Sequence, residues 1–347
     1  MEAIFDYYLA HLNNLIMKLV SYLKDNQDQL ALLIDDLLFD TDLMHPDLPV
    51  GMGMFLNYWE DLYPISRALE NTIKEGKISR QHGIDYQTVE VLPPVPHPTS
   101  CRNGYAFRPH LTLNTIPEFA QYPVFHFNNH NNIKGPGEVS CMPDHFEKLD
   151  FELQVAIVIC KPGKNIKAAD ADDYIAGYMI MNNFSARRLQ IEEMLLNLGP
   201  AKGKDFATTV GPILVTPDDL QSFKVECKPN HTGNAYNLSM KCAVNDVQVS
   251  EGNLADMEWT FAEIIERCSY GVQLFPGDII GSGAVGTGCF LELNNIGKLE
   301  NSDYKEQWLH EGDIIEIEIE NLGKLTNTIV KDESDFSILA LKKNVIS

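Results

Sequence analysis

Residues 177 to 190 read GYMIMNNFSARRLQ, an apolar run that changes abruptly into polar side chains. The apolar run is typical of a buried strand. The asparagines, arginines and glutamine that follow are rich in hydrogen-bond donors, which indicates a site for a ligand that carries oxygen atoms. Asn182 and Asn183 pose a question here, because a metal-dependent enzyme would need carboxylates at such a place.

The composition is that of an ordinary soluble protein, with 347 residues of which 44% are hydrophobic and 22% are charged. The length suits one large domain plus an extension, or two domains. The formal net charge of −22 argues against binding to nucleic acids or anionic membranes, since both are themselves negative. No segment of about 18 apolar residues and no basic region before an apolar core occurs, so we expect neither a membrane span nor a secretory signal.

Seven cysteines are scattered along the chain, and none of them forms a Cys-x-x-Cys pair. An odd number without close spacing suits free thiols in a reducing compartment and is not typical of a disulfide framework or a zinc site. We therefore expect a cytoplasmic protein whose cysteines are small buried apolar residues.

The N-terminal residues 1–90 are predicted to form a helical arm. Apolar residues recur with helical spacing over residues 4–23, and residues 28–39 and 59–76 continue in the same manner. Residues 91–100, VLPPVPHPTS, hold four prolines and are typical of a rigid linker. The chain therefore divides into an arm, a linker and a larger remainder.

That remainder, residues 101–347, is predicted to form one mainly β domain. Short apolar runs bounded by Gly or Pro are typical of strands, and IIEIEIE alternates strictly between apolar and charged residues. One helix that ends at a glycine lies among them. With the helical arm, this organisation predicts an α+β fold. The predicted strands are FELQVAIVI (151–159), GPILVTP (211–217), GDIIGSG (277–283) and GDIIEIEIENLG (312–323), and the helix is EWTFAEIIERCSYG (258–271).

Four polar clusters interrupt these runs and are the candidate functional segments. Glu152 and Gln154 are two positions apart on a predicted strand and so face the same side. Arg187 and Gln190 are three apart and share a face if a helix begins there. Taken alone, each pair is more simply explained as a solvent-exposed surface, and Lys204 as a solvated loop residue. The clusters are RNGYAFRPH (102–110), LDFELQ (149–154), NNFSARRLQ (182–190) with GPAKGKDFATT (199–209), and GTGCFLEL (286–293).

Taken together, in this order and spacing, the clusters resemble the signature region of the fumarylacetoacetate hydrolase family. LDFELQVAIV is similar to the acidic strand of that family, and GDIIGSG…FLEL and GDIIEIEIENLG are similar to its closing strands. The resemblance covers roughly residues 93–330 and implies a catalytic domain folded as a mixed β-sandwich roll, assembled as a homodimer. The helical arm does not resemble the small β-barrel domain of the fumarylacetoacetase branch.

The resemblance also implies catalytic residues. His110 matches the histidine that activates water, and Glu292 matches the carboxylate that orients it, which is the arrangement of a general base. The family further uses donors that stabilise oxyanions while a carbon–carbon bond of a β-diketo acid breaks. The donors match Arg187, Gln190 and Lys204, a substrate-contacting tyrosine matches Tyr105, and His126 falls where that branch has another tyrosine.

A divalent cation, Mg²⁺ or Ca²⁺, is implied by the same resemblance. The four carboxylates that hold it in the family match Asn103, Glu152, Gln154 and Asn183. Only Glu152 keeps its charge, so the formal charge of the ligand set falls from −4 to −1. Hard cations gain most of their affinity from carboxylates. We therefore expect a pocket of preserved shape whose cation is weakened or absent, and in which Arg188 partly replaces the cation.

Three functions follow from these observations. The first is a hydrolase that cleaves a carbon–carbon bond in a β-diketo (2,4-dioxo) acid, as in aromatic amino acid catabolism. The second is a decarboxylase, hydratase or isomerase of a related 2-oxo acid, because a fold does not fix its reaction. The third is a binding protein that has lost the metal. The joint presence of the catalytic set argues against the third. In each case the expected partner is a small keto acid and not a nucleic acid or a membrane.

Overall fold

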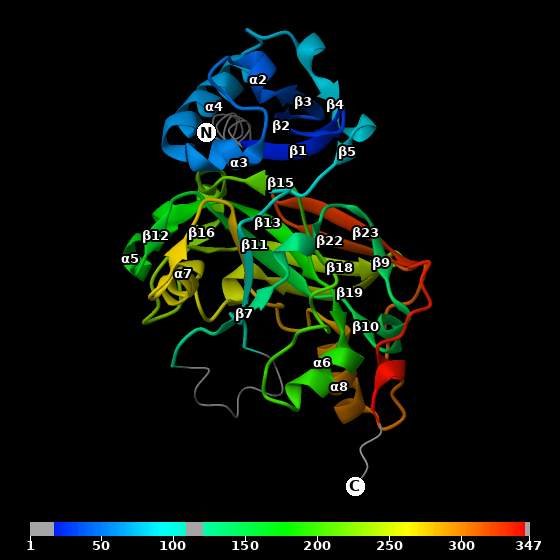
Figure 1. Ribbon diagram of the computed structural model, residues 1–347. Helices are drawn as coiled ribbons and strands as arrows, with labels where there is room; N and C mark the ends of the chain where they lie inside the picture. Colours follow the sequence, from blue (N-terminus) through cyan, green and yellow to red (C-terminus); the bar gives the residue numbers. More distant parts are fainter. Residues whose placement is uncertain (1–16, 109–120, 344–347) are drawn as a thin grey trace, which may run out of the picture.

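Two sheets organise the computed structural model, which describes residues 17–108 and 121–343 (Figure 1). The larger sheet has 12 strands and the smaller has 5. The larger sheet runs in the order β4 (Ile84–Asp85), β3 (Leu37–Asp40), β2 (Gln27–Ile34), β1 (Lys18–Lys24), β15 (Thr208–Val215), β13 (Ile175–Asn183), β11 (Leu153–Ile159), β21 (Asp278–Gly281), β6 (Ser100–Gly104) and β7 (Phe125–Asn128), with β5 (Glu90–Val91) on β1 and β8 (Ile133–Lys134) on β15.

The smaller sheet and the helices complete the architecture. The smaller sheet runs in the order β19 (Val247–Asn253), β18 (Ser239–Val244), β22 (Ile314–Ile319), β23 (Gly323–Lys331) and β9 (Gly137–Cys141). Short ladders pair β10 (Leu149–Asp150) with β14 (Ser185–Ala186), β12 (Gly163–Lys164) with β20 (Gln273–Leu274), and β16 (Lys224–Val225) with β17 (Ala235–Tyr236). The α-helices are α2 (Thr41–Met44), α3 (Met52–Asn57), α4 (Trp59–Lys74), α5 (Ala168–Ala171), α6 (Arg187–Met194), α7 (Phe261–Ser269) and α8 (Phe290–Glu300).

The predicted helical arm is wrong for residues 18–40, which form the three antiparallel strands β1 to β3. Asp25 and Asn26 adopt positive φ values of 50° and 61° and close a two-residue hairpin, in which Lys24 pairs with Gln27. Helix α4 is confirmed within the same arm. Residues 1–16, which carry most of the predicted first helix, lie outside the described residues.

The cause of this error is burial on both faces of the hairpin. Leu19 packs in one apolar cluster and its neighbour Val20 in the other, so successive residues are apolar although they point to opposite sides. A doubly buried strand loses the alternation that distinguishes it from a buried helix.

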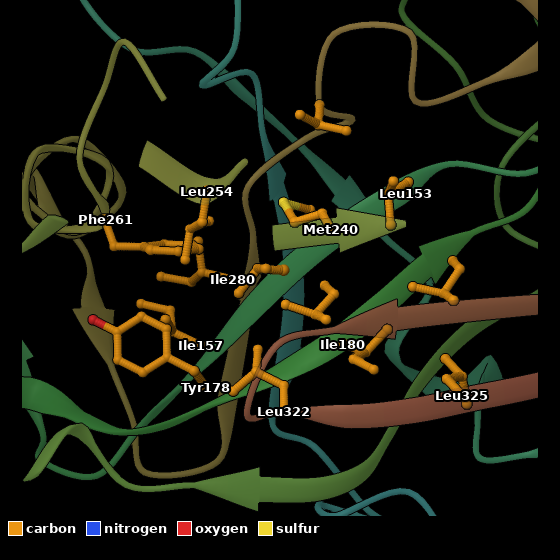
Figure 2. Close-up of a cluster of buried hydrophobic side chains, with 14 of the residues drawn as sticks. Leu153, Ile157, Tyr178, Ile180, Met240, Leu254, Phe261, Ile280, Leu322 and Leu325 are labelled. Atoms are coloured by element: carbon orange, nitrogen blue, oxygen red, sulfur yellow. The ribbon is translucent and has the colours of Figure 1, made fainter. Parts of the chain in front are cut away.

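The central strands of the larger sheet determine where the polar clusters meet. In β11 and β13 every residue is buried, and Figure 2 shows Ile157, Tyr178 and Ile180 of these strands in one apolar cluster with residues of the smaller sheet. Leu153 pairs with Asn182, and Asn103 pairs with Gly281. The polar residues at the ends of β6, β11 and β13 are therefore brought together.

The described strands and helices confirm the main predictions beyond the linker, with one exception. The apolar runs predicted as strands form β11, β15, β21 and β22, and the predicted helix forms α7. The segment FLEL, expected in a closing strand, instead begins α8. Its first turn is held by Asp150, whose carboxylate accepts the N–H groups of Phe290 and Leu291 at 2.7 and 3.0 Å. Helices α6 and α8 both lie at the end of the molecule opposite to the N-terminal strands (Figure 1).

Within the described ranges, no helix is both long enough and apolar enough to cross a membrane.

Candidate active site

A cavity of about 460 Å³ lies where β6, β7 and β11 meet α6 and α8. Polar side chains form one part of its wall, and apolar side chains from α6 and the loops form the rest. The predicted site residues that line it are Asn103, Tyr105, His126, Glu152, Arg187, Gln190, Lys204 and Glu292. Gln154 and Asn183 lie behind this wall and contact Glu152. His110 lies outside the described residues, so its contact with Glu292 stays a prediction.

Glu152 is the centre of the polar wall. Its Oε1 atom lies 2.6 Å from Lys204 Nζ and 3.0 Å from Arg187 Nη2. Burial alone would raise the pKa of Glu152, but the charges of Lys204 and Arg187 hold this pKa at about 2. Glu152 is therefore ionised at neutral pH and forms a buried ion pair with each base.

The amides of Gln154 and Asn183 occupy the other oxygen of Glu152. Gln154 Nε2 donates to Glu152 Oε2 at 2.8 Å, and Asn183 Nδ2 donates to the same oxygen at 3.3 Å. Asn183 presents its nitrogen to Glu152 because its own oxygen accepts hydrogen bonds from Asn128 and Thr208. A carboxylate at either position would lack this donor, since an ionised acid only accepts.

Asn182 and Asn103 shape the backbone around Glu152. Asn182 Oδ1 accepts the backbone N–H of Glu152 at 2.9 Å, which fixes the start of β11. Asn103 Oδ1 accepts the N–H of Gly283 at 3.1 Å. A Cβ atom on Gly281 would lie 2.7 Å from Asn103 Oδ1, so only glycine leaves room for this amide. The asparagines thus organise the site through hydrogen bonds.

Asp150 holds Arg187 in position, although the sequence analysis predicted no role for Asp150. Arg187 Nε donates to Asp150 Oδ2 at 2.7 Å, and both side chains are buried. Arg187 Nη1 donates to Gln190 Oε1 at 2.8 Å, as expected for positions one helical turn apart. Nη2 is buried and has no hydrogen-bond partner among the described residues, although it lies at ion-pair distance from Glu152. Arg187 thus contributes a positive charge beside Glu152 to the cavity wall.

The prediction that Arg188 partly replaces the cation is wrong. Arg188 points away from the cavity and pairs with Glu192 at 2.7 Å and with Glu147 at 3.5 Å. Successive residues of a helix point in directions about 100° apart, so only one of the two neighbouring arginines can face the cavity. The charges beside Glu152 come instead from Arg187 and Lys204.

His126 and Glu292 supply two further groups to the cavity. His126 Nε2 is buried without a hydrogen-bond partner in the described ranges. Burial and the nearby charge of Lys204 lower the pKa of His126 to about 4, so its imidazole is neutral at physiological pH. Glu292 stands in the first turn of α8 and accepts the backbone N–H of Thr287 at 2.8 Å.

The donor set does not fit a hard divalent cation. Across residues 17–108 and 121–343, no group of three or more His, Cys, Asp or Glu side chains is placed to hold a metal ion. The one carboxylate of the set, Glu152, already has both oxygens in contact with N–H donors. Mg²⁺ and Ca²⁺ need several oxygen ligands, with carboxylates among them. The structure therefore supports no step through a bound metal.

Residues 101–330 match the family described as Fumarylacetoacetate (FAA) hydrolase C-terminal. The chain is similar to the Xenopus laevis protein named oxaloacetate tautomerase fahd2, mitochondrial, with 28% identity over 84% of this chain and 82% of that protein.

Two solved structures share the fold. A probable 2-hydroxyhepta-2,4-diene-1,7-dioate isomerase from Mycobacterium abscessus has a TM-score of 0.67 and 23% identity, over 92% of this chain and 100% of that chain. Maleylpyruvate hydrolase from Sphingobium sp. SYK-6, in complex with manganese (II) and pyruvate, has a TM-score of 0.65 and 20% identity, over 91% of this chain and 100% of that chain. These likenesses confirm a mixed, strand-rich fold, while the description as a β-sandwich roll stays a prediction.

Proposed function

The chain belongs to the fumarylacetoacetate hydrolase family, and from this premise we propose that it is an enzyme that stabilises the enolate form of a small 2-oxo acid. The observation that carries the proposal is the pair of buried cations, Lys204 and Arg187, on the wall of one cavity. A 2-oxo acid carries a carboxylate beside a carbonyl oxygen, and enolate formation adds negative charge to that carbonyl oxygen. Donors already fixed around this charge stabilise it without reorganisation.

Each polar group of the wall has a part in this scheme. Lys204 and Arg187 attract the oxygen atoms of the substrate with their positive charges, and Gln190 holds the guanidinium of Arg187 through its Oε1 atom. His126 offers a neutral imidazole, and Tyr105 a hydroxyl, to the same ligand. The proton leaves the carbon next to the carbonyl, and its electron pair forms the new carbon–carbon double bond. His110, which the family resemblance implies as a general base, is our proposal for the acceptor.

Keto–enol tautomerisation is the reaction that we propose first. It needs only enolate stabilisation and the movement of a proton between the enol oxygen and the neighbouring carbon, and a relative at 28% identity is named an oxaloacetate tautomerase. The test follows the ultraviolet absorbance of enol-oxaloacetate while it converts to the keto form. We expect purified protein to accelerate this decay, and an unchanged decay over the full range of protein concentrations would refute the reaction.

Hydrolytic carbon–carbon cleavage is the second candidate, favoured by Glu292 on the cavity wall and by the expected His110. The two reactions differ in mass balance, because hydrolysis adds water and yields two acids. Incubation with an acylpyruvate or with fumarylacetoacetate, followed by chromatography of the products, distinguishes them. A tautomerase leaves the total amount of substrate unchanged, whereas a hydrolase consumes it.

Two earlier expectations remain proposals. A binding protein without activity would bind the keto acid and leave its absorbance unchanged in both assays. A homodimer would show twice the 39.0 kDa mass of the chain in light scattering.

A further inference from the structure

We propose that this site binds the oxygen atoms of a 2-oxo acid without a divalent cation, because the amides of Gln154 and Asn183, together with Lys204, satisfy Glu152 from within the chain. The inference deepens the proposed function and rests on it for the choice of ligand. The metal-free site itself rests on the contacts around Glu152.

The first argument is the position of the lysine ammonium group. Lys204 is buried, and its Nζ lies 2.6 Å from Glu152 Oε1 and 2.7 Å from Ser185 Oγ. An ammonium group has three N–H donors, and these two contacts use two of them within the described part of the chain. Because Lys204 also lines the cavity, the third donor is placed for an oxygen atom of a ligand.

The second argument is the balance of buried charge. Asp150, Glu152, Arg187 and Lys204 are all buried and joined by ion pairs, and we call them the cavity cluster. The negative charges of its two carboxylates balance the positive charges of its two bases. A divalent cation that bound beside Glu152 without an accompanying anion would leave two positive charges uncompensated in a buried place, which is costly.

The third argument explains the amides. Two carboxylates that both face Glu152 repel each other unless a cation lies between them. Gln154 and Asn183 instead donate N–H groups to Glu152, so these three side chains attract one another without a metal between them. Asn103 keeps its oxygen at the same wall, in the space that Gly281 leaves open. The amides and the lysine thus form one arrangement that satisfies Glu152 from within the chain.

The first experiment measures cation binding and needs no substrate. Mn²⁺ is titrated into the full-length protein, and its free aqueous signal is followed by electron paramagnetic resonance. We expect no saturable binding by the wild type. The triple variant Asn103→Asp, Gln154→Glu, Asn183→Asp is expected to bind Mn²⁺ at least about tenfold more tightly, because each restored carboxylate adds attraction. Tight Mn²⁺ binding by the wild type would overturn the proposal.

The second experiment measures anion binding with oxalate, a planar dianion that resembles the enolate of a 2-oxo acid. Titration calorimetry is run in metal-free buffer, with and without EDTA. We expect the same affinity in both buffers, and a loss of about 100-fold in Lys204→Met, since a charge-assisted contact disappears. Lys74→Met, which removes another largely buried and paired lysine, is the matched control and should keep the wild-type affinity.

The outcomes separate the two proposals. Oxalate binding that disappears with EDTA would refute the metal-free site. Failure to bind both oxalate and Mn²⁺ would refute the proposed function, while it would support the metal-free site. If Lys204→Met is unfolded at room temperature, the oxalate affinities of the wild type with and without EDTA are sufficient to test the metal-free site.

Discussion

Two buried ion clusters in this molecule have the same composition but different surroundings. The cavity cluster joins Asp150 and Glu152 to Arg187 and Lys204. A second cluster, which we call the scaffold cluster, joins Glu70 and Asp219 to Arg67 and Lys74. Each contains two carboxylates and two bases, and the carboxylates are buried in both.

The difference lies in what the remaining donors and acceptors contact. In the scaffold cluster, Asp219 also accepts the N–H of Met17 at 2.7 Å and the hydroxyl of Thr216 at 2.6 Å. The Arg67–Asp219 ion pair joins α4 to the 3-10 helix Pro217–Phe223 that follows β15, and Met17 joins the start of β1 to the same helix. The scaffold cluster therefore connects the N-terminal strands to the body of the protein. In the cavity cluster, Glu152, Arg187 and Lys204 line a cavity. The two clusters have the same charge, but the scaffold cluster joins parts of the fold, whereas the cavity cluster is placed to bind a ligand.

The largest expected effect separates the two lysines. Lys204→Met should lower kcat/KM for the tautomerisation by about 100- to 1,000-fold, as removal of one oxyanion donor does in other enzymes. Lys74→Met should leave kcat/KM within about twofold, because Lys74 pairs with Glu70 and does not line the cavity. Steady-state kinetics of both variants checks this. Equal losses of activity in the two variants would contradict the assignment of separate roles.

The next effect concerns the carboxylates that hold the arginines. Asp150→Asn should lower kcat by about tenfold with a smaller change in KM, since it weakens a charge-assisted hydrogen bond of about 1.5 kcal/mol to Arg187. Asp219→Asn should lower only the free energy of unfolding, by about 1.5 kcal/mol. Urea unfolding and steady-state kinetics on both variants measure the contrast. Normal kinetics in Asp150→Asn would show that Asp150 does not position Arg187 for catalysis.

A smaller effect is expected in the pH dependence of stability. Burial raises the pKa of Glu70 and of Asp219 above their ordinary values. A carboxyl with a raised folded pKa contributes stability that is present at acid pH and is lost as the pH rises through that pKa. The stability of the wild type relative to Glu70→Gln/Asp219→Asn should therefore fall as the pH rises above the ordinary carboxyl range of about pH 4. Chemical unfolding across this range tests the sign, and a rise would contradict it.

The smallest effect is expected for Arg188, whose ion pairs in the described ranges are with the exposed Glu147 and the partly exposed Glu192. Arg188→Ala should leave kcat/KM unchanged and alter the free energy of unfolding by less than about 0.5 kcal/mol. Arg187→Ala, its neighbour in the cavity cluster, is the matched comparison and should lose most of the activity. A large loss of activity in Arg188→Ala would place its charge at the site after all.

The sequence predicted those strands and helices whose local pattern of apolar and polar residues matches their burial in the folded protein. IIEIEIE forms β22 because one face is buried and the other is not. Residues 18–40 could not be assigned in this way, because both faces of the hairpin are buried. The same limit applies to the site. Family resemblance identified Arg187 and Lys204, whereas Asp150 supports them through a contact between residues 37 positions apart. An acid inside the apolar stretch LDF was the only local signal for it.

The pairing of β1 with β15 has a consequence for the stability of the protein against aggregation. Lys18 and Leu19 pair with Val215 and Leu214, and β8 pairs with β15 at Thr208 and Thr209. A shortened chain that begins at residue 101, where the family match begins, would leave the β1 side of β15 open. An open strand edge presents unpaired N–H and C=O groups to other chains and promotes their association. The N-terminal hairpin therefore protects the sheet edge, and its removal should promote aggregation through β15.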